Sequence, residues 1–155
     1  MFNTISNTKK MIAINLAVIF FIGLDRFLKV LALGSRGREF NLLGEILKFN
    51  YTANYYVAFS LPLAGRAVEA LIAVIILALM LFWLNGFLRR EYAKSAPLAL
   101  IILGAAGNLF DRLKYGYVID YLDLKYFTVF NLADAMIVAG AVLLLFNINN
   151  KKAAA

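Results

Sequence analysis

The sequence predicts an all-α membrane protein with four transmembrane helices and a small β-like cradle on the periplasmic or extracellular side. Hydrophobic residues make up 63% of the 155 residues, and the mean hydropathy is +0.79. Soluble domains are only roughly 45–50% apolar. Four apolar stretches have about the length that a helix needs to cross a bilayer, ~20 residues. The segments between them on one side are rich in β-branched and aromatic residues.

We expect one domain, residues 1–155, with helices at about 11–33, 67–88, 96–113 and 133–148. The first helix follows a polar stretch that lacks the small-residue cleavage site of a signal peptide, so it should be retained. The third begins with Ser95 as a capping residue and Pro97 in the first turn. The outer segments are expected at about residues 34–66 and 114–132.

The two outer segments show partial alternation of apolar and polar residues, which predicts short strands. They contain seven of the eight tyrosines, all except Tyr92. One interpretation is an interfacial belt that anchors the protein at the lipid headgroups. The other is a small sheet on the membrane that receives an extended peptide. Composition does not decide between them.

The basic residues predict the orientation. An even number of crossings puts both termini on one side. On that side the basic residues are dense beside the helix ends: Lys9, Lys10, Arg89, Arg90, Lys94, Lys151 and Lys152. The other side has more basic residues in total, spread over longer segments. Dense positive charge beside helix ends favours cytoplasmic termini. The net charge of +7 therefore reflects topology, and no nucleic-acid partner is expected because no basic run is interleaved with aromatic residues.

The chain contains no cysteine and no histidine. Disulfides, thiolate nucleophiles, the usual nitrogen and sulfur zinc ligands and a Ser-His-Asp triad are thereby excluded. Ser95 is the serine with a lysine beside it, Lys94, but adjacent residues on a helix do not face each other. We expect no metal and no cofactor.

Asp111 and Asp134 are the candidate catalytic residues. Asp111 lies near the end of the third apolar stretch and Asp134 at the start of the fourth. Consecutive helices run antiparallel, so these ends meet at one membrane face. Each aspartate has an asparagine three residues ahead, Asn108 and Asn131, which could orient the carboxylates or the substrate backbone. Ionisable residues within a membrane are costly and point to function.

A pair of neighbouring carboxylates permits acid–base chemistry. Two such groups cannot both ionise cheaply, so they share one proton and titrate as a unit. The ionised member can activate water for attack on a peptide carbonyl, while the protonated member donates to the oxyanion. Asp25 lies at the same depth, and we expect it to form an ion pair with Arg26 or Lys29. For Asp111 alone, the structural alternative is an ion pair with Arg112.

The blocks GAAGNLFDRLKYGYVIDYLDL and FNLADAMIVAG resemble the most diagnostic motifs of the lipoprotein signal peptidases, the type II signal peptidases of bacteria. The resemblance spans nearly the whole chain. In that family the aspartates of GNxxDR and FNxAD form the catalytic pair, which implies Asp111 and Asp134 here. The resemblance also implies a set of substrate-binding residues: Asn54, Asn108, Arg112, Asn131, Ala133, Asp25 and Lys29.

The resemblance implies an aspartic endopeptidase of the bacterial inner membrane that cuts a prolipoprotein before its diacylglyceryl-modified cysteine. Globomycin-type peptides would be inhibitors, and the enzyme would be a monomer among membrane lipids. Two motifs depart from the family pattern. DRFLK replaces D-Q-x-T-K, and NYYVAF has Tyr56 at the usual glycine. We expect Arg112 to hold the outer loop, and Tyr56 to take a different backbone conformation and cover the aspartates.

Two alternatives come from other functional classes. A small ion-coupled transporter could use Asp25, Asp111 and Asp134 as a proton relay. Such proteins usually carry repeated helix sets with sites at the midplane, and this chain shows neither. A structural subunit could use the acids only to pair helices. Neither alternative accounts for the two asparagines placed three residues ahead.

Overall fold

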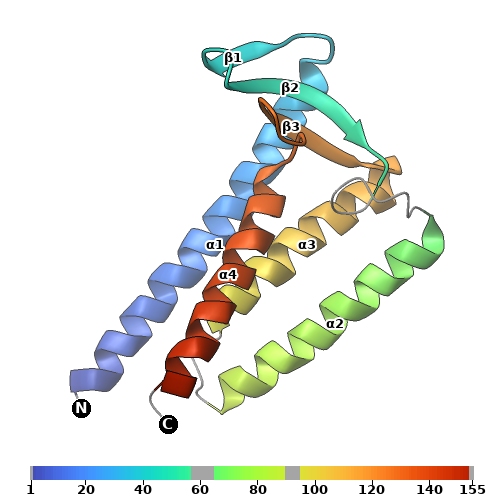
Figure 1. Cartoon of the computed structure of the whole chain (residues 1–155). Coiled ribbons are helices and arrows are strands. Elements are labelled where there is room, and N and C mark those ends of the chain that lie inside the picture. The colour runs from blue at the N-terminus through green and yellow to red at the C-terminus, as the bar shows by residue number, and fades with distance from the viewer. Residues whose placement is uncertain (1, 57–64, 90–94, 154–155) are drawn as a thin grey trace.

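The computed structural model describes residues 2–56, 65–89 and 95–153, and their side chains over 16–56, 65–89 and 95–147. The element order is α1 (Phe2–Gly34), β1 (Phe40–Leu43), β2 (Leu47–Asn54), α2 (Arg66–Leu88), α3 (Ser95–Tyr115), β3 (Val118–Leu124) and α4 (Leu132–Ala153). The helices lie side by side, the strands cap one end, and both termini lie at the other end (Figure 1). Helix α3 is central and contacts the other three helices.

The helices agree with the expected ranges except at the chain ends. Helix α1 begins at Phe2 instead of near residue 11, and α4 continues to Ala153. The apolar pattern marks the part of a helix that contacts lipid or protein, whereas backbone hydrogen bonds can extend the helix into polar sequence. Hydropathy therefore predicted the apolar part of each helix, not its full length.

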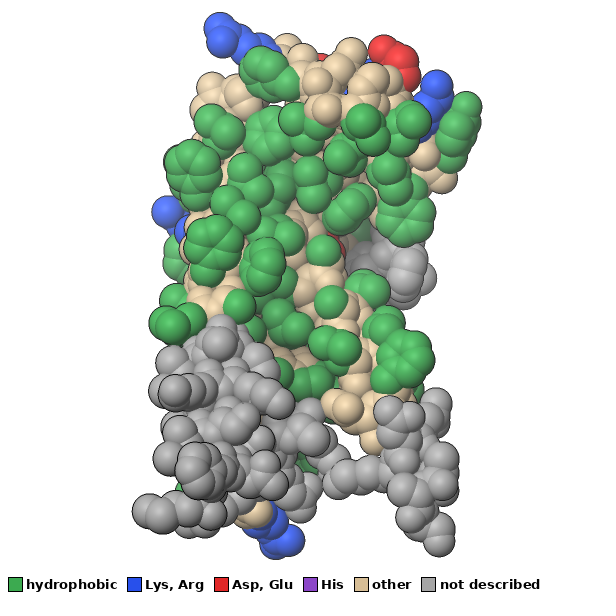
Figure 2. Space-filling view, turned by 90° about the vertical axis from the view of Figure 1, so that its left-hand side faces the viewer, with side chains coloured by type: hydrophobic (Ala, Val, Ile, Leu, Met, Phe, Trp, Pro, Cys, Tyr) green, Lys and Arg blue, Asp and Glu red, His purple; other side chains and the backbone are tan. Residues whose placement is uncertain are grey.

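Helices α2 and α3 are, within the described residues, long and apolar enough to cross a membrane, and a shorter apolar helix covers Leu132–Asn147. The most apolar part of α2 has a mean hydropathy of 2.7, yet only 6% of it is buried inside the protein. Such an exposed apolar surface requires a nonpolar surrounding. One face of the molecule is covered by hydrophobic side chains, with charged side chains mainly toward the two ends (Figure 2). The number of crossings, four, stays a prediction.

The predicted strands of both outer segments form one antiparallel sheet in the order β1-β2-β3. Leu47 pairs with Leu124 and Asn54 with Val118, so β3 lies along β2. Phe49, Tyr121 and other apolar residues pack this sheet against the end of α1. The cradle is therefore regular β-structure, and the class is helical with a small sheet rather than all-α. The register brings the end of β2 beside the start of β3.

Two glycines, Gly104 on α3 and Gly140 on α4, allow these helices to approach closely. A Cβ added at Gly104 would lie 2.6 Å from the Ala133 carbonyl oxygen, and one at Gly140 would lie 2.5 Å from the Pro97 carbonyl oxygen. We expect Gly104→Ala and Gly140→Ala each to lower the unfolding free energy by about 1–3 kcal/mol because backbone must move. Thermal unfolding in detergent measures this.

Gly23 is the matched control, because it lies in α1 and an added Cβ would meet nothing within 4 Å. Gly23→Ala should be neutral or slightly stabilising through its better helix propensity. An equal effect of all three substitutions would contradict the proposed close approach of α3 and α4.

Candidate active site

A buried lysine lies at the centre of a polar cluster where the helices meet the sheet. Lys29 is fully buried, and its Nζ lies 3.1 Å from Asp25 Oδ2 and 2.8 Å from Asp111 Oδ2. It also donates to Asn108 Oδ1 at 2.9 Å. The expected ion pair of Asp25 with Lys29 is thus confirmed. The cluster joins α1 to α3 at the common depth that the sequence predicted.

The Asp111 carboxylate forms ion pairs with two cations. Its side chain is 0% exposed, and its Oδ1 lies 2.6 Å from an Arg26 guanidinium nitrogen while Oδ2 contacts Lys29. The Ile119 backbone N–H also points at Oδ2, at 3.4 Å. The alternative partner Arg112 was wrong, because neighbours on a helix point in different directions. Arg112 instead donates a hydrogen bond of 2.9 Å to the Tyr56 carbonyl oxygen, so it holds the outer loop as predicted.

Asp134 is only partly buried and lies in the first turn of α4. Asn131 caps this helix: its side chain accepts from the Asp134 N–H at 2.9 Å, and its own N–H donates to Asp134 Oδ2 at 3.2 Å. This reciprocal pair is a capping box. Asn108 Nδ2 donates to Asp134 Oδ1 at 2.7 Å. The asparagine three residues before Asp134 thus sets the position of its carboxylate.

Asp120, on β3, is an acidic residue that the sequence analysis missed. Its side chain is 1% exposed, and it accepts hydrogen bonds from Asn131 Nδ2 at 2.6 Å and Asn54 Nδ2 at 2.8 Å. Burial raises the pKa of the Asp120 carboxyl to about 7, with the nearby charge of Asp134 adding to the effect and the two asparagine hydrogen bonds opposing it. Near neutral pH this carboxyl can hold a proton.

A signal for Asp120 was present in the sequence. It stands in YVIDYL, an acid inside an apolar strand, and aspartate is almost never fully buried unless it is paired. Acids that interrupt apolar helices are more conspicuous than Asp120, which lies on a strand. Because β3 continues directly from α3, the strand brings Asp120 back beside the start of α4.

Asn131 connects the two acids. Its side chain contacts Asp120 and its backbone contacts Asp134, so both carboxylates are fixed by one fully buried residue. Asp111 is linked to Asp134 less directly, through Lys29 and then Asn108. The candidate acids therefore divide into an ion-paired group, Asp25 and Asp111, and a hydrogen-bonded group, Asp120 and Asp134.

A sequence profile described as Signal peptidase (SPase) II matches residues 17–149. The chain belongs to the signal peptidase II family. It is similar to the lipoprotein signal peptidase of Caldicellulosiruptor bescii, 40% identical over 106 residues, covering 68% of this chain and 69% of the relative. That of Halothermothrix orenii is 33% identical over 132 residues, covering 84% and 90%. A solved bacterial membrane enzyme has the same fold, with a TM-score of 0.78 and 21% identity over 90% of this chain and 89% of that one.

Several residues of this signal peptidase II chain that were expected to bind substrate are buried and contact other residues of the protein. Asp25 accepts from the Tyr121 hydroxyl at 3.0 Å and from the Ala133 N–H at 3.1 Å. Lys29, Asn131 and Ala133 are all 0% exposed. Tyr121 is likewise fully buried, so it does not belong to an interfacial belt. These residues lock the start of α4 to α1 and β3.

The loop after β2 reaches the same cluster. Asn54 Oδ1 accepts from the Tyr56 N–H at 3.0 Å while its Nδ2 holds Asp120. Within the described chain, Tyr126 is the non-glycine residue with positive φ, so Tyr56 takes a different conformation from that typical of glycine, as predicted. Its side chain is exposed. Ala58 and Phe59, also part of the predicted loop, lie outside the described residues.

We expect Tyr56→Gly to weaken globomycin or substrate binding by about 1–3 kcal/mol through lost apolar burial. Single-turnover cleavage of bound substrate should change less, because other elements carry the aspartates. Inhibitor affinity and single-turnover rate, measured together, test this. Tyr126→Gly is the control, since Tyr126 is a fully solvent-facing tyrosine (96% exposed) on the same sheet side of the protein. Unchanged affinity in Tyr56→Gly would contradict a covering role.

Proposed function

We propose that this chain is a membrane aspartic endopeptidase that removes the signal peptide of diacylglyceryl-modified prolipoproteins by cutting before the lipidated cysteine. Its family and the names of its relatives support the peptidase activity and the substrate. The chain contains no cysteine or histidine, which removes the thiolate and imidazole groups that many other peptidases use. The observation that carries the proposal is the grouping of Asp120 and Asp134 around Asn131.

We assign the catalytic pair to Asp134 and Asp120. Asp134 is the more accessible carboxylate and acts as the base that takes a proton from water as the oxygen attacks the scissile carbonyl. Asp120, whose pKa is raised to about 7 by burial, gives its proton to the developing oxyanion. In the second step the proton on Asp134 passes to the amine leaving group, and Asp120 recovers its proton as the carbonyl reforms. In this assignment the more buried acid, Asp120, holds the proton, and the more accessible acid, Asp134, accepts one from water.

Asp111 has a positioning role in this proposal, which revises the pair that the sequence predicted. Its side chain is 0% exposed, and its two oxygens lie against the cations of Arg26 and Lys29, so it is engaged in ion pairs and does not face water. Asp111 pairs with Lys29, Lys29 donates to Asn108, and Asn108 donates to Asp134. This chain of contacts holds the Asp134 carboxylate in place. The original pair, Asp111 with Asp134, is the competing assignment.

Asn54 and Arg112 are the residues of the predicted binding set that face the loop. Asn54 connects Asp120 to the Tyr56 N–H, and Arg112 holds the Tyr56 carbonyl. A substrate peptide backbone offers the same N–H and carbonyl groups. We therefore assign these two residues to substrate binding and the buried Asp25, Lys29, Asn131 and Ala133 to support of the site.

The incubation of purified protein with a diacylglyceryl-modified prolipoprotein tests the function. We expect one cut immediately before the lipidated cysteine, inhibition by globomycin, and no dependence on added metal or chelator. The unmodified precursor is the control substrate. A cut elsewhere, or equal cleavage of both precursors, would contradict the proposal.

We place the enzyme in the bacterial inner membrane as a monomer with four crossings, both termini cytoplasmic and the acidic pair toward the outer face. Because the chain has no cysteine, single-cysteine variants report topology directly. A cysteine at position 38, between α1 and β1, should react with an impermeant thiol reagent in intact cells. One at position 92, which lies outside the described residues, should resist it. The reverse pattern would overturn the orientation.

A further inference from the structure

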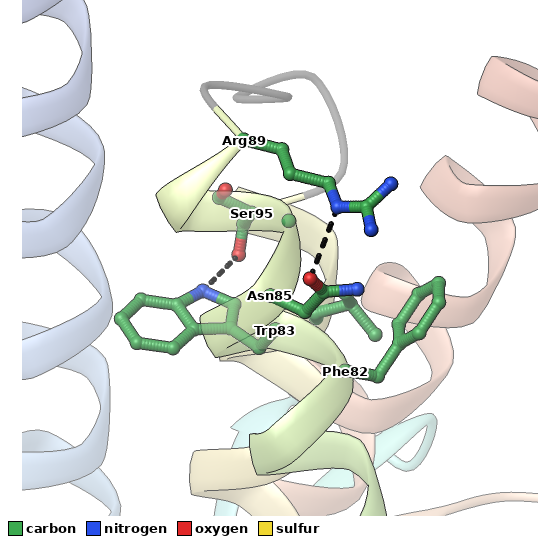
Figure 3. Close-up of a pocket in the computed structure, with 7 residues that line it drawn as sticks. Phe82, Trp83, Asn85, Arg89 and Ser95 are labelled. Atoms are coloured by element: carbon green, nitrogen blue, oxygen red, sulfur yellow. Dashed lines mark hydrogen bonds between the residues drawn. The ribbon is translucent and has the colours of Figure 1, made fainter.

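A cavity lies at the end of the helices opposite the acidic cluster. There α2 ends and α3 begins, and they enclose about 200 Å³ (Figure 3). The cavity is lined by Phe82, Trp83, Asn85, Gly86, Arg89, Ser95 and Leu98. The rise of α3 from Ser95 to Asp111 is ~24 Å at 1.5 Å per residue. The cavity and Asp111 therefore lie toward opposite faces of a hydrocarbon core ~30 Å thick.

Among the described residues that line the cavity, Arg89 is charged and none is acidic. Arg89 Nε donates to Asn85 Oδ1 at 3.1 Å, and no ion pair of Arg89 occurs within the part of the chain that the structure describes. The guanidinium tip and the Asn85 amide nitrogen point to the same side of α2, beside the Phe82 ring (Figure 3). Planar guanidinium donors suit the oxygens of a phosphate.

The start of α3 adds to this positive character, whereas the end of α2 carries the opposite partial charge and has the cationic Arg89 at its C-cap. The first N–H groups of a helix lack intrahelical partners, and that end carries partial positive charge. Ser95, the first residue of α3, is buried in the cavity wall. Trp83 Nε1 donates to the Ser95 carbonyl oxygen at 3.1 Å, so the start of α3 is fixed against α2. Arg89 and the start of α3 thus border the same cavity.

An apolar row leads from this site toward the middle of the membrane-facing surface. Leu77, Leu81, Asn85 and Arg89 follow one another at four-residue spacing along α2, so they lie on one side of the helix. Leu77 is 56% and Leu81 60% exposed. Along this side of α2 the guanidinium and the amide come first and two exposed leucine side chains follow. A phospholipid has the matching order, with a phosphate headgroup followed by acyl chains.

We propose that this cavity binds an anionic phospholipid of the leaflet that faces the termini. The phosphodiester lies at Arg89 and Asn85 and at the start of α3, and an acyl chain lies along Leu81 and Leu77. Basic pockets between transmembrane helices are a known kind of headgroup site. Bound there, the lipid bridges the end of α2 to α3 and leaves the acidic cluster untouched.

Trp83 gives a direct readout, because it is the single tryptophan of the chain and lines the cavity. The full-length protein is reconstituted in phosphatidylcholine bilayers that contain equal small amounts of either brominated phosphatidylglycerol or brominated phosphatidylcholine. Bromine quenches tryptophan on contact. We expect stronger quenching by the brominated phosphatidylglycerol. Equal quenching by the two lipids would overturn the proposal.

Arg89→Gln should abolish this preference, and Arg89→Lys should restore part of it by charge alone. Arg66→Gln is the matched control, since it removes the same charge from the other end of the same helix, and it should keep the preference. A preference that survives in Arg89→Gln would overturn the site. Prolipoprotein cleavage should be unchanged in Arg89→Gln, which separates this test from that of the catalytic proposal.

A competition separates a lipid site from a free-phosphate site. Glycerol 3-phosphate carries the headgroup chemistry without acyl chains. It should leave the quenching by brominated phosphatidylglycerol unchanged, because the acyl chain contributes to binding. If glycerol 3-phosphate abolishes the preference, the cavity takes free phosphate esters and the lipid assignment is overturned.

Discussion

Asp120→Asn and Asp134→Asn should each remove prolipoprotein cleavage, by on the order of 10²–10⁴-fold, because general acid–base groups typically contribute that much. Amide groups keep the shape of the carboxyls but can neither take a proton from water nor hold one for the oxyanion. The double variant should be little worse than either single variant, since residues that act as a unit are not additive. Steady-state cleavage with thermal unfolding of each variant measures this.

Asp123→Asn is the matched control for the strand. Asp123 lies on β3 like Asp120 and accepts a hydrogen bond from Asn50 Nδ2 at 2.9 Å, but it does not touch Asn131. It should cleave normally. Asp111→Asn should keep measurable turnover and mainly lower stability, because it leaves Arg26 without its carboxylate and leaves Lys29 with Asp25 alone. If a folded Asp111→Asn were inactive while Asp120→Asn cleaved normally, the pair would be Asp111 and Asp134.

The pH dependence gives a second measure of the same pair. Burial and the charge of Asp134 raise the pKa of Asp120 to about 7. The protonated form, which serves as the acid, is therefore lost as pH rises through that value, and kcat/KM should fall there. The apparent value belongs to the pair and not to one residue. Activity that is unchanged across this range would argue against Asp120 as the proton donor.

Local sequence signals predicted much of the fold. Apolar runs marked the helices, and alternation marked the strands of the outer segments. Asp25 was expected to pair with Arg26 or Lys29, and it pairs with Lys29. These features depend on residues close together in the chain. The capping box of Asn131 and Asp134 is local too, and it explains the spacing that the sequence analysis interpreted as catalytic.

The partner choices of the acids could not be predicted in the same way. The Arg26–Asp111 pair joins residues that are 85 positions apart, and it depends on how α1 packs on α3. Asp120 becomes a neighbour of Asp134 only because β3 folds back over the start of α4. In sequence, Asp111 was the more visible acid because it interrupts an apolar helix, although its burial serves an ion pair.

Lys29→Met should be the most destabilising single substitution in the cluster. Lys29 is the shared partner of Asp25 and Asp111, and all three are essentially unexposed. Among the described residues, the ion pair of Arg26 is with Asp111 and not with Asp25. Loss of the lysine leaves the Asp25 carboxylate buried without a cation. Breaking a buried pair in this way costs about 3–5 kcal/mol. Thermal unfolding in detergent should show a large drop in Tm.

A second substitution shows whether charge is the cause. Asp25→Asn added to Lys29→Met removes the uncompensated carboxylate, and the amide can still accept from the Tyr121 hydroxyl and the Ala133 N–H that bond to Asp25. The double variant should therefore be more stable than Lys29→Met alone. Lys114→Met is the control, because Lys114 is exposed on α3 and lies over the Phe110 and Tyr115 rings, and it should change Tm little. If the double variant were as unstable as Lys29→Met, lost packing and not an unpaired charge would explain the effect, and the electrostatic role of Lys29 would have to be abandoned.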